Sequence, residues 1–304
     1  MTTTPKGVFC AAATPFDENL VPDHARLAAH CRRLLEDGCH GISLLGTTGE
    51  ANSLSSAERM ALLEAVVAAG IAPGQLLPGT GVSAYTETAA LTRHALSLGI
   101  TTVLMLPPFY YKPVPDQGLI DAYSRTIEAV ADSRLRVVLY HIPPMAQVPI
   151  PHEVIAALIE RYPGTIVGVK DSSGELEHMK SLIASFPELS ILTGADHFML
   201  ELLGLGGGGC ITATSNLVAA QMRTIYDHHD DAGRAAEVAA AQQRVVAYRA
   251  LIGRYQPQVP TIKAMIGLRR GDAGWARTRP PFLALPEDRM RALADEFAGL
   301  EAAA

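Results

Sequence analysis

The residue with the clearest chemical potential is Lys170, which ends the apolar run Ile166 to Val169. Lysine is among the residues least often buried, so its place at the end of such a run calls for an explanation. Burial among apolar groups lowers a lysine pKa, because the charged form loses its water. A desolvated lysine forms imines with keto substrates. The alternative is a lysine that extends from the strand end into solvent.

Three further residues have the chemistry to assist an imine-forming lysine. Tyr140 carries a phenol that can move protons to and from a carbinolamine, or one that only bonds a backbone group. Thr47 and Thr48 place two hydroxyls and successive N–H groups in one turn. Such a turn suits a small carboxylate such as that of pyruvate, although ordinary loop structure would also explain a Thr-Thr pair.

Strands must position these residues, and the sequence has a regular alternation that supplies them. Short apolar runs recur roughly every 20–35 residues, the spacing of one strand–helix unit. Segments of helical periodicity lie between them. The eight runs are residues 7–16, 41–46, 76–81, 101–108, 136–143, 166–173, 189–196 and 209–216.

The expected helices have recognisable starts and ends. Ser55 to Glu58 and Ser172 to Glu175 both fit the capping box, a serine with glutamate three positions later. Glycine ends many helices, and three of the expected helices end at Gly38, Gly70 and Gly99.

Eight consecutive strand–helix units predict an α/β protein, most simply a TIM (β/α)8 barrel. An open, doubly wound sheet is the alternative. After the eighth run, residues 219–300 are helical in pattern, with interruptions near residues 255–261 and 278–287. We therefore expect a barrel over residues 1–233 and a C-terminal helical extension over residues 234–304, packed on the barrel or on a partner subunit.

The ends of the expected strands define the expected site. In TIM barrels the active site lies at the carboxyl ends of the strands. The segments that meet this rim are residues 46–50, 107–113, 140–144, 170 and 193–197. The reactive candidates therefore share one rim.

Composition and charge exclude several classes of protein. The chain has 304 residues, 18% of them charged, and a net charge of −6. An acidic surface repels phosphate backbones, so we expect no nucleic-acid partner. No apolar stretch approaches the roughly 18 residues of a membrane span, and the N-terminal segment lacks a signal-peptide pattern. We expect a cytoplasmic protein whose four cysteines are small buried hydrophobes.

Four motifs in order carry a resemblance to a known family. They are GTTGE at 46–50, YHIP at 140–143, GVKDSSG at 168–174 and RPP at 279–281. Together they resemble the dihydrodipicolinate synthase / N-acetylneuraminate lyase superfamily of class I, pyruvate-dependent aldolases. The resemblance implies a TIM barrel and a lyase that uses neither a metal nor an organic cofactor.

The resemblance also implies a role for each matching residue. Lys170 corresponds to the lysine that forms the Schiff base with pyruvate or another 2-keto acid, and Tyr140 to the tyrosine that relays protons. Thr47 corresponds to the threonine that links this tyrosine to a second one. Thr48 corresponds to the threonine that holds the 2-keto carboxylate, with Gly46 beside it in the substrate-binding turn.

Assembly and the second substrate follow from the same resemblance. Tyr110 is similar to the tyrosine that reaches into a neighbouring subunit's site, and Ile211 falls where backbone lines the pyruvate. The family is usually a homotetramer, a dimer of dimers. Its partners are small molecules, a 2-keto acid and an aldehyde.

Two departures bear on the substrate. Met145 stands where dihydrodipicolinate synthases have an arginine for the carboxylate of aspartate semialdehyde, and a thioether cannot make that bidentate contact. Neuraminate lyases have Asp-Glu where this chain has Asp196-His197. His141, Met145 and His197 are therefore candidates to line the pocket of a different second substrate, or ordinary packing residues.

The leading interpretation is a Schiff-base lyase, an aldolase or dehydratase of a 2-keto-3-deoxy sugar acid or a related keto acid. The alternatives are a true dihydrodipicolinate synthase, a metal-dependent barrel aldolase and a catalytically silent keto-acid-binding protein.

Two other patterns do not indicate sites. Residues 204–209 fit G-x-G-x-x-G but precede a strand, which predicts a helix-to-strand turn, and residues 227–231 are a solvated acidic helix end rather than a metal cluster.

Overall fold

The computed structural model describes residues 4–302, which form two compact units. Within the described residues, unit 1 consists of residues 4–7 and 72–211, and unit 2 consists of residues 8–71 and 212–302. The units differ from the expected division into residues 1–233 and 234–304, which stays a prediction.

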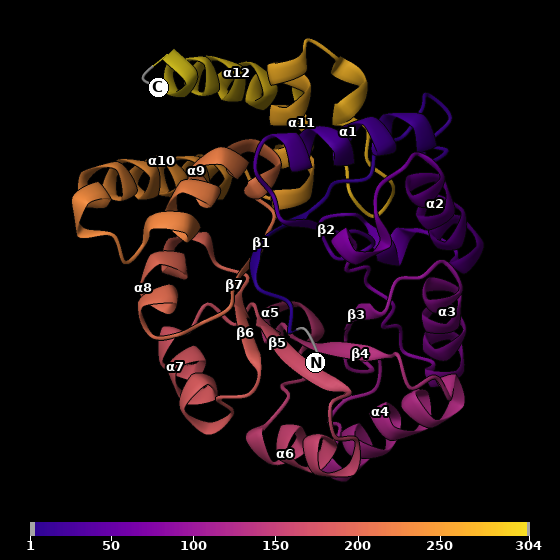
Figure 1. Ribbon diagram of the computed structural model, residues 1–304. Helices are drawn as coiled ribbons and strands as arrows, with labels where there is room; N and C mark the ends of the chain where they lie inside the picture. Colours follow the sequence, from indigo (N-terminus) through magenta and orange to yellow (C-terminus); the bar gives the residue numbers. More distant parts are fainter. Residues whose placement is uncertain (1–3, 303–304) are drawn as a thin grey trace. The chain divides into compact units, whose positions relative to one another are not determined.

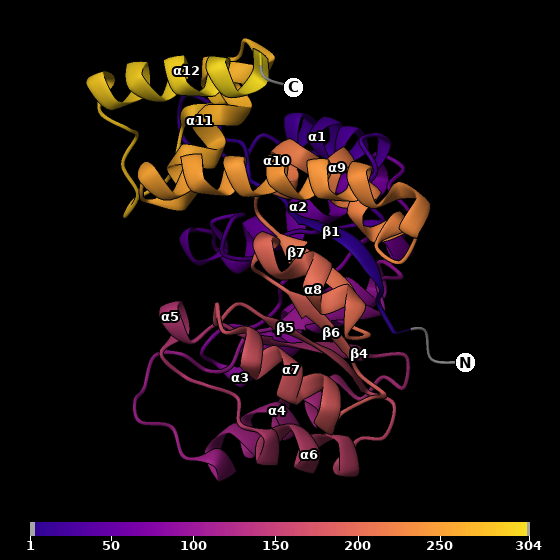
Figure 2. The same cartoon turned by 90° about the vertical axis from the view of Figure 1, so that its left-hand side faces the viewer.

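Unit 1 is built on parallel strands whose side chains are almost entirely buried. Neighbouring pairs in the order β3-β4-β5-β6-β7 are hydrogen-bonded. In Figure 1 the helices α3, α4, α6, α7 and α8 lie around the outside of these strands, and Figure 2 shows α4 and α6 below them. The strands are β3 (Thr102–Met105), β4 (Arg136–His141), β5 (Ile166–Asp171), β6 (Ser190–Thr193) and β7 (Gly209–Thr212). The helices are α3 (Tyr85–Ser97), α4 (Asp116–Val130), α5 (Pro143–Ala146), α6 (His152–Arg161), α7 (Leu176–Ser185) and α8 (Met199–Gly204).

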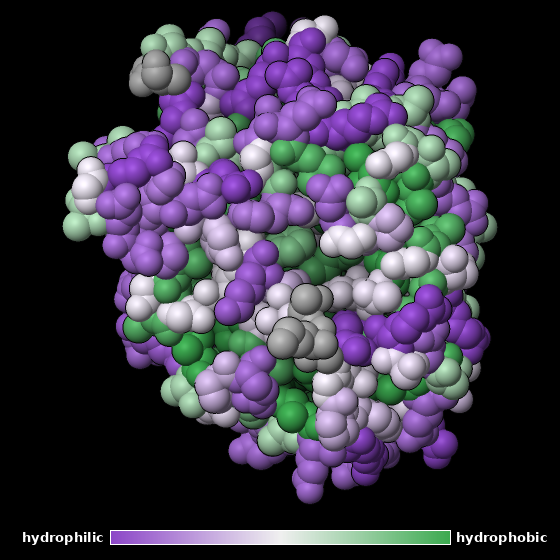
Figure 3. All heavy atoms as spheres, in the orientation of Figure 1, coloured by the Kyte–Doolittle hydropathy of each residue, from purple (hydrophilic) through white to green (hydrophobic). Residues whose placement is uncertain are grey.

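Unit 2 contains one parallel strand pair and most of the expected C-terminal helices. In Figure 3 the faces of its last helices that are turned to the viewer carry mainly hydrophilic side chains. The strands are β1 (Gly7–Ala11) and β2 (Gly41–Ser43). The helices are α1 (His24–Glu36), α2 (Ser56–Ala68), α9 (Ser215–His228), α10 (Ala235–Arg254), α11 (Gln258–Arg270) and α12 (Glu287–Ala302).

Seven of the eight expected runs contain a named strand within residues 4–302, and the run at 76–81 does not. This segment forms only a bridge from Gly79 to Leu104, with bonds from Thr80 N and to Pro78 O. Pro78 has no N–H for a ladder. Lys170 therefore lies on β5, the strand within the sixth expected run.

One of the two capping boxes is confirmed and the other is wrong. Ser55 accepts from Glu58 N, and Glu58 accepts from Ser55 N, at the start of α2. The second expected helix does not begin at Ser172, because α7 begins at Leu176. Ser173 Oγ instead accepts from Glu175 N and donates to Asp171. The serine that bonds the upstream carboxylate is thus Ser173 rather than the expected cap Ser172.

Other local predictions are confirmed. All four cysteines are buried, and none is paired in a disulfide. Glycines with positive φ follow α1, α2 and α3, at Gly38, Gly70 and Gly99. Residues 204–209 join the end of α8 to the start of β7. Within residues 4–302, no helix is both long enough and apolar enough to span a membrane.

Candidate active site

Lys170 and Tyr140 form the centre of the candidate site. They are register partners on the adjacent strands β5 and β4, and both are buried, with 4% and 3% of their surfaces exposed. The Nζ atom of Lys170 lies 4.1 Å from the centroid of the Tyr140 ring. The structure therefore brings together the predicted nucleophile and the predicted proton relay.

The local sequence of β5 explains how the lysine reaches this position. Val167 and Val169 are buried, so the strand is fixed by apolar packing on both sides of Gly168. A Cβ atom at Gly168 would meet Ser190 O at 2.5 Å. The glycine thus permits the close approach of β5 to β6 two residues before Lys170. The strand ends after Asp171, where Ser172 N bonds His141 O.

The threonine turn belongs to unit 2. After β2, the backbone passes through left-handed conformations at Leu45 and Glu50, with φ of 59° and 55°. Glu50 N donates to Thr47 O, and Ala51 N donates to Gly46 O. Thr48 is buried, with 7% of its surface exposed. The roles expected for these residues toward a substrate stay predictions.

A buried ion pair anchors this turn, and sequence reasoning missed it. Lys263 Nζ on α11 lies 2.6 Å from Glu50 Oε1, and both side chains are fully buried. Burial lowers the pKa of Lys263 to about 8, against the opposing effect of Glu50. Glu50 Oε2 also accepts from Arg279 N, and Arg279 forms a two-pronged contact with Glu58. The motifs GTTGE and RPP contained a signal for the contact between Glu50 and Arg279, but Lys263 lies in neither motif.

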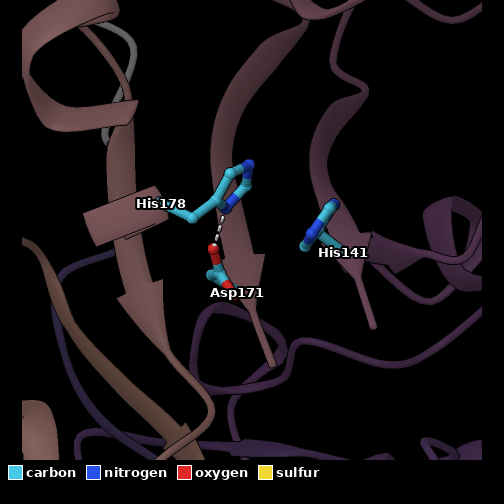
Figure 4. Close-up of side chains that lie close together, drawn as sticks. All are labelled: His141, Asp171 and His178. Carbon is cyan, nitrogen blue, oxygen red and sulfur yellow. Dashed lines mark hydrogen bonds and ion pairs between the residues drawn. The ribbon is translucent and has the colours of Figure 1, made fainter. Parts of the chain in front are cut away.

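On the opposite face of β4 and β5 lies a second cluster, formed by His141, Asp171 and His178 (Figure 4). Successive strand residues point to opposite faces, so His141 and Asp171 point away from Tyr140 and Lys170. The Nδ1 atom of His178, on α7, lies 2.5 Å from Asp171 Oδ2. The rings of His141 and His178 stack with centroids 4.5 Å apart.

The protonation of this cluster follows from its surroundings. Burial lowers the pKa of His141 to about 4. The hydrogen bond to Asp171 raises the pKa of His178, against the effect of burial. Burial opposes ionisation of Asp171, but the bonds from His178 and Ser173 outweigh it and lower its pKa. At neutral pH His141 is therefore a neutral imidazole, and it stacks on a histidine whose protonated form is favoured by Asp171.

This arrangement suits hydrogen bonding better than metal binding. His141 Nδ1 accepts from Ile150 N at 3.1 Å, so the proton of the neutral ring lies on Nε2, which then has no lone pair for a metal. His178 Nδ1 is engaged by Asp171. The two rings are tilted by only 20°, and lone pairs in nearly parallel planes do not converge on one ion.

The remaining predicted residues of unit 1 lie in varied environments. Tyr110 is 73% exposed and packs edge-on against Tyr111. Met145 is 63% exposed on α5. His197 is exposed and packs on Phe198. Ile211 is buried in β7.

Known proteins share both the sequence and the fold of this chain. A protein of Chloroflexus aurantiacus named an uncharacterized DapA-like lyase is 39% identical over 292 residues, which is 95% of each chain. The crystal structure of dihydrodipicolinate synthase from Agrobacterium tumefaciens is 30% identical, covers 96% of this chain and 99% of its own, and has a TM-score of 0.87. YagE from E. coli K12, a prophage protein of the dihydrodipicolinic acid synthase family solved in complex with pyruvate, is 26% identical, covers 97% and 98%, and has a TM-score of 0.88.

The two structures extend over nearly all of the chain, which confirms the predicted TIM barrel with additional C-terminal helices. The model of the dihydrodipicolinate synthetase family matches residues 4–298. The chain therefore belongs to the dihydrodipicolinate synthetase family, a family of lyases.

Proposed function

We propose that this lyase forms a Schiff base with pyruvate or another 2-keto acid through Lys170. The observation that carries the proposal is the buried amine of Lys170, 4.1 Å from the ring centroid of its register partner Tyr140. A buried lysine beside a phenol supplies both the nucleophile and the proton donor that imine formation needs.

The reaction proceeds by covalent catalysis. The neutral amine of Lys170 adds to the keto carbon, and the resulting carbinolamine loses water once its hydroxyl receives a proton from Tyr140. The protonated imine withdraws electrons, so C3 loses a proton or a carbon–carbon bond breaks to give an enamine. The enamine then adds to an aldehyde, or it is reprotonated after cleavage. The imine nitrogen accepts the electron pair released at C3, and in the addition the aldehyde oxygen accepts the displaced pair and is protonated, so the proposed reaction requires no metal or organic cofactor.

The threonine turn has a supporting role in this proposal. Thr48, with the adjacent Gly46, holds the 2-keto carboxylate, since hydroxyl and backbone N–H groups are its natural partners. Thr47 links Tyr140 to a second tyrosine. Tyr110 is highly exposed, which fits a side chain that completes the site of a neighbouring subunit in a homotetramer. Ile211 lines the pyruvate with its backbone.

For the second substrate we favour an aldehyde that arises from a 2-keto-3-deoxy sugar acid or a related keto acid. Met145, on the exposed helix α5, offers no charge for the carboxylate of aspartate semialdehyde. The alternative is a 4-hydroxy-tetrahydrodipicolinate synthase, the activity for which a 32% identical relative from Synechococcus is named. His141 points to the face opposite Tyr140, so His197 and Met145 are the better candidates for substrate contact. The cytoplasmic location expected from the sequence stays a prediction.

Trapping the imine tests the proposal. We expect pyruvate plus borohydride to add the mass of reduced pyruvate to Lys170, located by digestion and mass spectrometry. Lys170→Ala should fold, lack the adduct and lose activity, whereas Lys180→Ala, which removes a surface lysine of α7, should keep both. No adduct on Lys170 in the unmodified chain would refute the Schiff base. An adduct without turnover on any aldehyde would identify a keto-acid-binding protein.

A further inference from the structure

A cavity of about 730 Å³ lies within unit 2, between α1, α9 and α11. Five charged side chains line it, three arginines and two carboxylates: Arg33, Glu36, Asp37, Arg269 and Arg270. These residues belong neither to the Lys170 site nor to the threonine turn, so the proposed reaction leaves the cavity without a role.

Most of these charges have partners of opposite sign. Arg33 Nε lies 3.7 Å from Asp37 Oδ2, and Arg269 Nη2 lies 2.6 Å from Glu301 Oε1. Arg270 differs: among the residues that the structure describes, no carboxylate lies within ion-pair distance of it. The cavity therefore contains one partly buried guanidinium whose charge no ion pair balances.

Among residues 4–302, the hydrogen-bond partner of Arg270 is a neutral histidine. Its Nη2 atom donates to Nδ1 of His30 at 2.6 Å. His30 is fully buried, and burial, reinforced by Arg270, lowers its pKa to about 3. An arginine has five N–H donors, so most of those on Arg270 remain available. Burial and the positive charge of Arg33 lower the pKa of Arg270, against the opposing effects of Asp37 and Asp272.

The surroundings hold this guanidinium in place. Its carbon atom lies 4.9 Å from the centre of the Trp275 ring, and His30 packs edge-on against the same ring at 4.8 Å. A guanidinium stacked on an aromatic face is pre-organised, which reduces the entropy lost on forming bidentate hydrogen bonds.

A chain of hydrogen bonds runs from Arg270 to the end of β1. His30 Nε2 lies 2.8 Å from Asn216 Oδ1, and Asn216 Nδ2 donates to Ala11 O, the last residue of β1. Asn216 Oδ1 also accepts from Ala13 N. Carboxyl ends of barrel strands carry the active site in this fold. A molecule in the cavity that binds Arg270 therefore contacts a series of hydrogen bonds that ends at the carboxyl end of β1.

We propose that this cavity binds a small oxyanion, a carboxylate or a phosphate, with Arg270 as its principal ligand and Arg33 and Arg269 as secondary ones. Planar, bidentate recognition of such groups is what a guanidinium does best. Glu36 and Asp37 at the same cavity exclude large polyanions, so the occupant is small.

The chain contains a built-in reporter for this site. Trp275 is its only tryptophan, and it touches Arg270. Titration of the full chain with inorganic phosphate, and separately with succinate, should change the tryptophan emission in a saturable way. Sodium chloride at equal ionic strength should not. Calorimetry of the same titrations gives affinities that do not depend on the tryptophan signal.

Variants locate the site. Arg270→Gln should weaken binding at least about tenfold, since it removes the charge and the bidentate contact. Ala220→Glu places a carboxylate on the exposed lining and should weaken binding without disturbing packing. The matched control is Arg93→Gln on α3, an exposed arginine of unit 1 that bonds only Ala129 O, and it should leave the affinity unchanged.

The proposal is overturned if neither phosphate nor succinate gives a saturable change in the unmodified chain. It is also overturned if Arg270→Gln and Ala220→Glu, both checked for folding by thermal denaturation, bind as tightly as the Arg93→Gln control. None of these readouts depends on imine formation at Lys170.

Discussion

Lys170 and Tyr140 are paired twice over, once through their backbones and once through their side chains. They are register partners on β5 and β4, and the Nζ atom of Lys170 lies over the face of the Tyr140 ring, 4.1 Å from its centroid. The strand pairing fixes their separation before any substrate arrives. The pair is therefore pre-organised, and the proposed relay role rests on the phenol hydroxyl rather than on the position of the ring.

Tyr140→Phe tests that distinction. The substitution keeps the ring beneath Lys170 and removes only the hydroxyl, so we expect the fold and the substrate KM to change little. Loss of a general acid and base should lower kcat by a factor of about 10²–10⁴. Steady-state kinetics with the substrate that gives turnover measures both constants. A Tyr140→Phe enzyme with unchanged kcat would remove the relay role from the proposal.

Much of this pairing could be predicted from the sequence. The apolar run before Lys170 and the run that ends at Tyr140 both predicted strands, and strands of a parallel sheet place their carboxyl ends together. The buried pair of Glu50 and Lys263 could not be predicted, because its members are 213 positions apart. Periodicity carries no information on which distant side chains meet.

Alternation along a strand explains why His141 does not lie on the same face as Tyr140, as its place in the motif suggested. His141 follows Tyr140 directly, so it lay within the same motif and was a candidate for the substrate pocket. A one-residue step along a strand reverses the direction of the side chain. His141 therefore stacks on His178 instead, and only its Tyr140 neighbour faces Lys170.

Gly168→Ala should disturb the site through the backbone. An added Cβ would lie 2.5 Å from Ser190 O, a contact with backbone that neither strand can avoid without moving β5 from β6. Overpacking of this kind costs about 1–3 kcal/mol of unfolding free energy. Because Lys170 is two residues further along β5, we expect both the melting temperature and the rate of imine trapping to fall. The matched control is Gly74→Ala, where no atom lies within 4 Å of the new Cβ. Equal melting temperatures for the two variants would contradict the prediction.

His178→Gln should change how stability depends on pH. Asp171 raises the pKa of His178 above its ordinary 6.5, so the folded state binds the proton more tightly than the unfolded state. The stabilisation is fully present below pH 6.5 and is lost as the pH rises through the raised pKa. Glutamine can still donate an N–H to Asp171 but does not titrate.

Thermal unfolding across this range measures the effect. The unmodified chain should exceed His178→Gln in melting temperature by the largest margin below pH 6.5, and the margin should shrink as the pH rises. His141, His152, Asp171 and Glu175 surround His178 and are present in both proteins, so their titration largely cancels in the difference. A margin that is constant with pH would show that the pair does not carry an extra proton.

Removing one member of the ion pair between Lys263 and Glu50 should lower the unfolding free energy more than replacing both members with uncharged residues. Both side chains are fully buried at a separation of 2.6 Å, so Lys263→Met leaves Glu50 without its counter-charge, and Glu50→Gln leaves Lys263 without one. Removing one partner of a buried pair costs about 3–5 kcal/mol. The double variant leaves no buried charge, and its loss should be well below the sum of the two single losses. Denaturant unfolding of the unmodified chain, the two single variants and the double variant gives the coupling free energy. The control is Lys180→Met, which breaks an ion pair at the surface and should lower the unfolding free energy by no more than about 1 kcal/mol. If the loss of unfolding free energy in the double variant equals the sum of the two single losses, Lys263 and Glu50 stabilise the threonine turn independently. A smaller loss is expected because only the single variants contain an unbalanced buried charge.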